Sequence, residues 1–327
     1  SQRCAQGACM ELPSCAAPGP GLSDCGAKRE SCCTSIELPA GSYHRTFVPN
    51  AVGEATRPGA PASVSGFRLD KYLVTVGRFR KFVSAWSGGT GYSPTPGSGK
   101  HQHLNDGKGL VLMSGDGHEP GWRAGDAASV TPSPANLRCF ARDATWTDVA
   151  GARENLPINC VNWAEAYAFC IWDGGFLPSE AEWEYAAAGG SELRKYPWGA
   201  TEPGTNNQYA IFKCLYPAGP AVLGAGICNG TNIAPVGSVP LGTSRWGHLD
   251  MAGELWEWTL DAYPGPALPD SYNNLCTDCV YWSAAADRLV RGGQFANPEP
   301  SLETTFRENG PAGGRFPGVG IRCARSL

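Results

Sequence analysis

The strongest constraint on this chain is its cysteine content. The sequence contains 14 cysteines, an even number. Six of them fall in the first 33 residues: Cys4, Cys9, Cys15, Cys25, Cys32 and Cys33. Such density in a segment with few large apolar side chains predicts a disulfide framework formed in an oxidising compartment. A zinc site is the weaker alternative, because no histidine lies nearby and no paired CxxC modules recur.

Charge and hydrophobicity limit the possible partners. The net charge is −4, and 42% of the residues are hydrophobic. Phosphate binding needs clustered Lys and Arg, which the sequence lacks, so we expect no nucleic-acid partner. No stretch approaches the roughly 18 apolar residues of a membrane span, so no transmembrane segment is expected. No leader precedes Ser1, and we expect a secreted, extracellular or periplasmic protein whose signal peptide has been removed.

Apolar periodicity predicts a few helices. A first helix, capped by Thr75, is expected to bury Val76, Phe79, Val83 and Trp86. A second apolar stripe comprises Trp163, Ala166, Tyr167, Cys170 and Ile171. Ser179 and Glu182 then form a capping box that starts a third helix. Glu180 and Glu184 are assigned to the charged surface of that helix.

Seven short motifs follow one another along the chain. They are 160–163 (CVNW), 175–186 (GFLPSEAEWEYA), 196–199 (YPWG), 234–237 (APVG), 250–259 (DMAGELWEWT), 291–295 (RGGQF) and 320–323 (GIRC). Each is weakly specific alone, but the ordered series is highly specific. From residue 36 to 323 the sequence resembles the formylglycine-generating enzyme (sulfatase-modifying factor) family.

The resemblance implies a fold and a domain organisation. Residues 36–327 are expected to form one α+β domain, related to the C-type lectin fold, with little regular secondary structure. Residues 1–35 form a separate cysteine-rich segment. The resemblance also implies a disulfide between Cys170 and Cys323. A content of 43 Gly and 27 Pro, interleaved with 11 Trp, independently favours short elements and much irregular backbone.

The resemblance also locates a degenerate active site. In active family members, two cysteines after the Arg-Gly-Gly-x-Phe strand bind copper and oxidise a substrate cysteine with O2. Soft Cu(I) favours such thiolate ligands. Here Asn297 and Leu302 occupy the two cysteine positions. An amide and an aliphatic side chain cannot form this site, so we expect formylglycine-generating activity to be absent.

The family further implies a structural calcium ion beside the turn at residues 253–258. Gly253, Glu254, Leu255 and Glu257 are the predicted calcium set, through backbone and carboxylate oxygens. Hard Ca²⁺ accepts both kinds of ligand. The alternative is that Glu257 only hydrogen-bonds the turn.

Three of the five histidines cluster outside these motifs, at His101, His103 and His118. In an extended segment His101 and His103 would point to the same side, since side chains alternate with period two. Together with a third ligand they would suit copper or iron. The alternative is that these histidines stack and hydrogen-bond on the surface of a long loop.

The other cysteines have less defined partners. Spacing suggests the pairs Cys139–Cys160 and Cys214–Cys228, whereas the first six cysteines allow 15 connectivities. Cys276 and Cys279 have the spacing of a metal or redox dithiol. In a secreted protein, a local disulfide or bridges to other strands fit better.

The tryptophans raise the question of a carbohydrate groove, because sugar faces stack on aromatic rings. Those in the family motifs are instead predicted to belong to the core: Trp163, Trp183, Trp198, Trp256 and Trp258.

Two functional hypotheses remain. The first is a secreted, non-catalytic recognition or structural module that binds a glycan, a protein or an identical subunit through residues 88–148 and 297–315. The second is a copper- or iron-dependent oxidoreductase that uses the histidine cluster in place of the family's cysteines. We favour the first hypothesis, because the catalytic cysteines are missing and nothing else in the sequence supports their replacement by the histidines.

Overall fold

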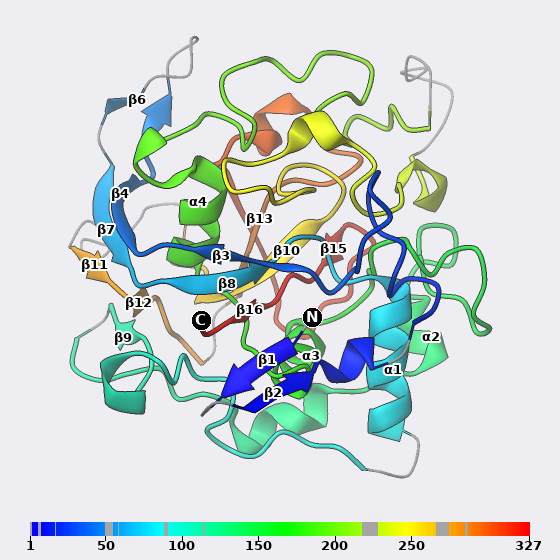
Figure 1. The fold of residues 1–327 in the computed structure, drawn as a ribbon, viewed down its shortest axis with the longest axis horizontal. Coiled ribbons are helices and arrows are strands. Elements are labelled where there is room, and N and C mark those ends of the chain that lie inside the picture. Colours follow the sequence, from blue (N-terminus) through cyan, green and yellow to red (C-terminus); the bar gives the residue numbers. More distant parts are fainter. Residues whose placement is uncertain are drawn as a thin grey trace.

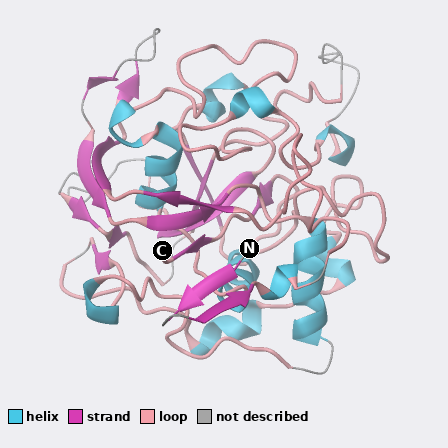
Figure 2. Cartoon of the chain, in the orientation of Figure 1, coloured by secondary structure: helices cyan, strands magenta, loops and turns pink. Residues whose placement is uncertain are grey.

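The computed structural model describes residues 2–5, 8–16, 18–49, 55–57, 59–87, 91–113, 115–217, 228–265, 275–284 and 287–327. Short helices and strands are joined by long irregular segments (Figure 1). Loops and turns make up most of the trace in Figure 2. The predicted α+β class with little regular secondary structure is therefore confirmed.

The strands form several small sheets. A four-stranded sheet has the order β14-β13-β10-β15, and two three-stranded sheets have the orders β11-β7-β4 and β16-β8-β3. Two-stranded pairs are β1-β2, β12-β9 and β5-β6. The bounds are β1 Gln2–Ala5, β2 Ala8–Glu11, β3 Ser35–Leu38, β4 Gly41–Arg45, β5 Val48–Pro49, β6 Ala55–Arg57, β7 Ala60–Val64, β8 Phe67–Asp70, β9 Val111–Leu112, β10 Trp256–Ala262, β11 Cys276–Thr277, β12 Cys279–Val280, β13 Arg288–Arg291, β14 Arg307–Gly310, β15 Val319–Gly320 and β16 Ala324–Arg325.

The strand β10 lies at the centre of the four-stranded sheet, and all its residues are buried. It pairs antiparallel with β13, where Trp258 lies opposite Val290. On its other edge it pairs parallel with β15, where Trp256 lies opposite Val319. Because side chains alternate along a strand, Trp256 and Trp258 share one face of the sheet.

The helices begin and end largely where the sequence predicts. Their bounds are α1 Val76–Ser87, α2 Pro134–Leu137, α3 Trp163–Trp172 and α4 Glu180–Ala188. Thr75 Oγ1 accepts the backbone N–H of Arg78 at 3.2 Å, which caps α1. Ser179 and Glu182 form the predicted capping box of α4. Gly189 ends that helix in the left-handed conformation, with φ of 70°, which glycine adopts without strain.

The largest hydrophobic cluster joins α1, α3 and β10 to the C-terminal segment. A disulfide between Cys170 on α3 and Cys323 ties the end of the chain to this core. Both cysteines are fully buried. The bridge closes a long loop, which is the geometry in which a disulfide restricts the unfolded chain most.

Charged side chains inside the protein are neutralised by one another. Glu257 on β10 is fully buried, and its two carboxylate oxygens accept hydrogen bonds from Arg322 at 2.9 Å each. Trp183 Nε1 donates to the same carboxylate at 2.8 Å. A buried charge without a partner would cost several kcal/mol, so this pairing is a condition for burying β10.

The prediction that Glu180 and Glu184 lie on the helix surface is wrong. Both are buried, as is every residue of α4. Arg291 Nη2 donates to Glu184 Oε2 at 2.8 Å, and Arg307 pairs with Glu180. The prediction failed because α4 is enclosed on all sides and has no face exposed to solvent.

The N-terminal segment packs closely on the rest of the chain. Its described disulfides are Cys15–Cys33 and Cys25–Cys32. The backbone N–H of Ser14 donates to Asp173 Oδ1 at 2.9 Å, and Arg78 Nε donates to Ser14 Oγ at 3.0 Å. The predicted disulfide framework is confirmed for these four cysteines, whereas the side chains of Cys4 and Cys9 lie outside the described residues. The domain boundary at residue 35 stays a prediction.

Replacing Glu257 with alanine is expected to lower the free energy of unfolding by about 3–5 kcal/mol, because Arg322 would be left buried without its counter-ion. The matched control is Glu37→Ala, which breaks an exposed pair with Arg68 and is expected to cost at most about 1 kcal/mol. Urea unfolding followed by tryptophan fluorescence measures both. Equal losses in the two variants would contradict this account of the core.

Candidate functional site

Asn297 and Leu302 follow β13 at the two positions where the resemblance expects cysteines. Leu302 is 1% exposed and belongs to a hydrophobic cluster that includes Tyr196 and Phe212. The side-chain oxygen of Asn297 accepts the backbone N–H of Gln294 at 3.1 Å. One side chain therefore fills the core and the other stabilises a turn.

A cleft of about 220 Å³ opens next to Gln294. It lies between β10, β13, β14 and the segment 316–319, and its main lining side chains are Trp256, Trp258, Val290, Gln294, Glu308, Asn309, Phe316 and Val319. Most of this lining is aromatic or aliphatic, with a few polar groups. That composition is typical of a site for a small ligand.

Hydrogen bonds and ring contacts hold the aromatic walls in place. Trp258 Nε1 donates to the backbone carbonyl of Val161 at 3.1 Å, and its ring centroid lies 6.3 Å from that of Phe316. The Trp256 ring lies 5.9 Å from that of Phe306. The side-chain amide of Gln294 makes no hydrogen bond to the described residues, so it can serve a ligand.

The sequence analysis missed this cleft. It assigned Trp256 and Trp258 to the core, and they are indeed 5% and 0% exposed. Their ring edges nevertheless form a wall of the cleft. The spacing of two tryptophans on alternate positions of a strand was the available signal, since it places both rings on one face.

His101 lies between two carboxylates. It is fully buried, with Nδ1 at 2.9 Å from Glu119 Oε1 and Nε2 at 3.0 Å from Glu182 Oε2. Burial opposes the charged ring, but the two carboxylates outweigh burial and raise the pKa of His101 to about 10. Both ring nitrogens of His101 are thus engaged by carboxylates, and the copper or iron site stays a prediction.

The other two histidines, His103 and His118, make contacts of a different kind. The His103 ring stacks on Phe176, with centroids 5.8 Å apart, and lies 6.2 Å from the His101 ring. His118 pairs with Val111 through an isolated backbone bridge. Across the described ranges, no three His, Cys, Asp or Glu side chains are placed to hold a metal ion.

The two glutamates of the predicted calcium set differ. Both carboxylate oxygens of Glu257 accept hydrogen bonds from Arg322, and Trp183 donates to one of them. Glu254 is 1% exposed, and its Oε1 accepts the backbone N–H of Ala234 at 2.7 Å. Its Oε2 is buried with no hydrogen-bond partner among the described residues. The calcium set stays a prediction: Glu257 is paired with Arg322, and one oxygen of Glu254 has no hydrogen-bond partner among the described residues.

A second carboxyl group lies near Glu254. Burial raises the pKa of Glu254 well above its usual value, and the charge of Asp250 raises it further. Burial also raises the pKa of Asp250 to about 6. A hard cation would relieve this repulsion. Gly253, with φ of 78°, and Leu255, fully buried, form the backbone of the same turn.

The cysteines of the main domain are paired. The structure contains the disulfides Cys139–Cys160, Cys214–Cys228 and Cys276–Cys279. The last bridge joins the neighbouring strands β11 and β12. No free cysteine occurs among the described side chains, so the Cys276-x-x-Cys279 sequence supplies no free thiols.

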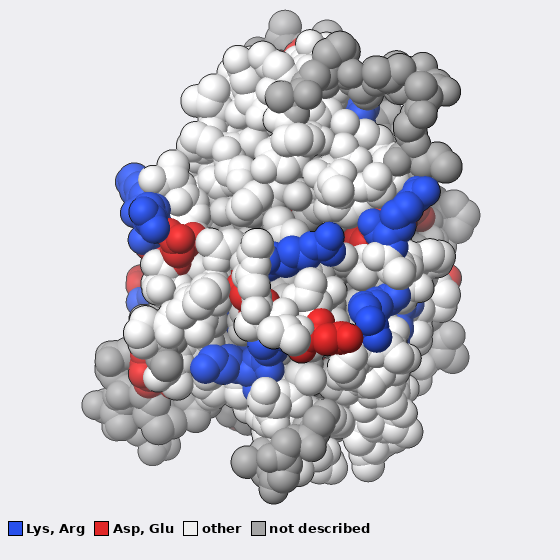
Figure 3. All heavy atoms as spheres, turned by 90° about the vertical axis from the view of Figure 1, so that its right-hand side faces the viewer, with Lys and Arg blue, Asp and Glu red and all other residues white. Residues whose placement is uncertain are grey.

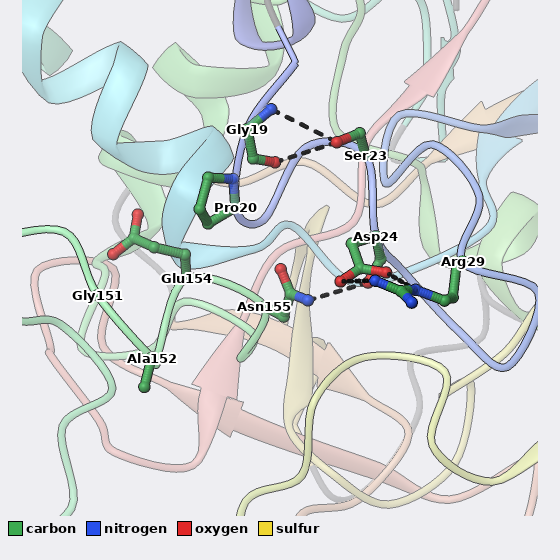
Figure 4. Close-up of a pocket in the computed structure, with 9 residues that line it drawn as sticks. All are labelled: Gly19, Pro20, Ser23, Asp24, Arg29, Gly151, Ala152, Glu154 and Asn155. Atoms are coloured by element: carbon green, nitrogen blue, oxygen red, sulfur yellow. Dashed lines mark hydrogen bonds and ion pairs between the residues drawn. The ribbon is translucent and has the colours of Figure 1, made fainter.

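A larger, open pocket of about 580 Å³ lies between the N-terminal segment and the loop that ends at Asn155 (Figure 4). The Asn155 side-chain amide donates to the backbone carbonyl of Asp24 at 2.9 Å, and Arg29 faces the Asp24 carboxylate at 2.7 Å. Glu154 is held by Arg80. Asp24, Arg29 and Glu154 are therefore already paired, so these three charges are not free to bind a ligand.

Surface charge is mixed in sign. On the face drawn in Figure 3, Lys and Arg alternate with Asp and Glu and are separated by uncharged surface. This face has no broad basic patch of the kind that binds nucleic acid. Within the described ranges, no helix is long and apolar enough to cross a bilayer.

Known proteins share this architecture. Residues 24–327 match the model of the sulfatase-modifying factor enzyme 1-like domain. The chain is 29% identical to the formylglycine-generating enzyme of Mus musculus, over 85% of this chain and 70% of that protein. It is 31% identical to the formylglycine-generating enzyme of Streptomyces coelicolor, over 86% and 82%. It is 28% identical to the hercynine oxygenase of Mycobacterium tuberculosis, over 77% of this chain and 50% of that protein.

A solved structure agrees with the fold. PvdO from Pseudomonas aeruginosa aligns with a TM-score of 0.58 at 22% identity, covering 95% of this chain and 100% of that chain. At this identity the likeness supports the fold alone.

The His101 ring is expected to stay protonated at pH 8, where ordinary histidines are neutral. Its folded pKa of about 10 exceeds the usual 6.5, so the stability it contributes is full below pH 6.5 and declines as the pH rises towards 10. NMR titration of the imidazole signals measures this. His101→Asn should remove the shifted signal, and the exposed control His44→Gln should leave it. A His101 ring that titrates near 6.5 would contradict the assignment.

Proposed function

The chain belongs to the sulfatase-modifying factor enzyme 1-like family, and within this family we propose that it is a secreted, non-catalytic recognition module. The observation that carries the proposal is the chemistry of positions 297 and 302. An amide and a buried isobutyl group stand there. Neither offers the thiolate that soft copper needs. The activity for which the formylglycine-generating enzymes are named is therefore not assigned to this chain.

We assign the binding site to the aromatic cleft beside Gln294. Sugar rings combine apolar C–H faces with polar edges. Phe316 and the 5% exposed Trp256 offer aromatic surface, while Gln294 and Glu308 offer polar groups. A glycan fits this small concave site better than a protein or an identical subunit, since stable protein interfaces need about 800 Å² on each partner.

Secretion is supported by the disulfides. Bridges such as Cys170–Cys323 and Cys25–Cys32 are fully or nearly fully buried within the fold. Structural disulfides of this kind form in oxidising compartments and are rare in the cytosol.

A calcium ion at Glu254 is part of the proposal. The unpartnered Oε2 of Glu254 and the nearby carboxylate of Asp250 are its supporting observations. Such an ion would neutralise the buried carboxyl groups and stabilise the turn that leads into β10. Its role would be structural.

The alternative is a metal-dependent oxidoreductase. It is favoured by the resemblance to proteins named as enzymes, including hercynine oxygenase. This chain covers half of the length of that protein. Copper or iron would then need ligands other than His101, because that ring is enclosed by Glu119 and Glu182. Metal analysis of the purified protein separates the two hypotheses: stoichiometric copper or iron supports the enzyme, and calcium alone supports the module.

A glycan array should identify at least one sugar that binds the purified protein. Phe316→Ala, which removes one wall of the cleft, is expected to weaken that binding about two- to twelvefold, because a stacking ring contributes about 0.5–1.5 kcal/mol. Phe140→Ala, at an exposed phenylalanine outside the cleft, is the matched control and should bind as the wild type does. No binding to any sugar would count against the glycan assignment.

The same preparation, charged with copper, should be offered a sulfatase-type cysteine peptide. Mass spectrometry is expected to find no conversion of the thiol to an aldehyde. Formylglycine in the product would overturn the non-catalytic proposal.

Calcium is expected to raise the thermal midpoint of the wild type, because a ligand that binds only the folded state stabilises it by about 2.7 kcal/mol at 100 times its Kd. Glu254→Gln should lose this calcium-dependent shift. Glu37→Gln, at an exposed side chain of β3, should keep it. An unchanged midpoint of the wild type in millimolar calcium would remove calcium from the proposal.

A further inference from the structure

A third cavity, of about 510 Å³, is lined by residues that the aromatic cleft does not use. Arg288, the first residue of β13, forms part of its wall and is 1% exposed. The guanidinium carbon lies 4.0 Å from the centroid of the Trp163 ring and 4.5 Å from that of Trp282. The two indoles and the strand therefore fix the position of the cation.

The charge of Arg288 has no counter-ion among the described residues. Other arginines that are equally buried form ion pairs with carboxylates: Arg78, Arg291 and Arg322. Arg288 Nη1 donates only to the backbone carbonyl of Leu260 at 3.2 Å, and its buried Nε has no partner. Burial and, to a smaller extent, the neighbouring Arg123 lower the pKa of Arg288 to about 10. An anion bound beside Arg288 would offset the free-energy cost of burying its unpaired charge.

The N-terminus of α3 opens onto the same cavity. Trp163 and Ala164, its first two residues, both line it. The Trp163 N–H donates to Ala312, whereas the Ala164 N–H has no acceptor in the described part of the chain. Free N–H groups and the helix dipole attract anions at such an end. The acidic residue of the first turn, Glu165, is already neutralised by Arg315.

The cavity carries a single net positive charge. Two arginines and one aspartate line it, and two positive charges minus one negative leave +1. Arg123 holds Asp126 at 2.6 Å, so that pair is neutral and the net charge belongs to Arg288. The next carboxylate that acts on Arg288, Asp261, accepts the backbone N–H of Tyr281 at 2.8 Å and does not pair with the guanidinium.

We propose that this cavity binds a small organic monocarboxylate, held by Arg288 and the N-terminus of α3. A planar guanidinium matches the two oxygens of a carboxylate. One net positive charge suits a singly charged ligand, whereas a phosphate dianion would leave negative charge without compensation. Trp163 and Ala312 provide apolar surface for the body of the acid. The inference is independent of the glycan proposal, because the two sites share no lining residue.

Benzoate is the probe, with benzamide as its neutral analogue and inorganic phosphate as the dianion. Trp163 and Trp282 lie beside Arg288, so quenching of tryptophan fluorescence should report binding, and calorimetry should confirm it. We expect saturable binding of benzoate. Benzamide and phosphate are expected to bind at least about tenfold more weakly, because the guanidinium prefers a planar singly charged group.

Gly313→Asp and Gly313→Asn form a matched pair of variants. An added Cβ at Gly313, which lines the cavity, meets no atom within 4 Å, so both variants should fold. Gly313→Asn should bind benzoate within about threefold of the wild type, and Gly313→Asp at least about tenfold more weakly, because it adds a like charge. Arg288→Lys keeps the buried charge but loses the planar fork, so it should also bind more weakly.

Three results would each overturn the proposal. They are the same benzoate affinity in Gly313→Asp and Gly313→Asn, tighter binding of phosphate than of benzoate, and the absence of saturable benzoate binding by the wild type.

Discussion

The buried ion pair between Glu257 and Arg322 is the interaction on which the rest of the structure depends. Glu257 lies in the central strand β10, and Arg322 lies in the C-terminal segment beside Cys323. The same guanidinium donates to the backbone carbonyls of Asp70 and Leu249 at 2.8 Å each. One side chain therefore joins β10, the end of β8 and the segment before the 253–258 turn. This junction positions β10, whose tryptophans form the wall of the cleft.

The interior repeats this principle elsewhere. Arg291 neutralises Glu184, and His101 is enclosed by Glu119 and Glu182. Such charges are costly to bury alone, so each is matched within the fold. Arg288 departs from the pattern, since its fixed guanidinium has no carboxylate in the described chain. Glu254 likewise has no counter-ion among the described residues, and at both sites the uncompensated buried group is a reason to expect a ligand.

The scaffold does not need the sulfur chemistry of its enzymatic relatives. The anchors of β10, β13 and α4 are ion pairs, and they lie outside positions 297 and 302. On the proposed function, Asn297 and Leu302 stand where the relatives carry copper-binding thiols, and the strand end and the adjacent cleft do not depend on such thiols. A family of this construction can therefore lose its chemistry and keep a binding surface, which is the basis of the recognition proposal.

The sequence by itself determined the family resemblance, the α+β class and the helix caps. These features depend on residue identity and short spacing, and Ser179 with Glu182 is an example within one helical turn. Only the tertiary structure decided the environment of each charged side chain. His101 meets Glu182 across 81 residues of sequence, and Trp256 lies opposite Val319 from a distant segment. Burial and pairing of this kind depend on which remote segments pack together, and the local periodicity of the sequence does not reveal that.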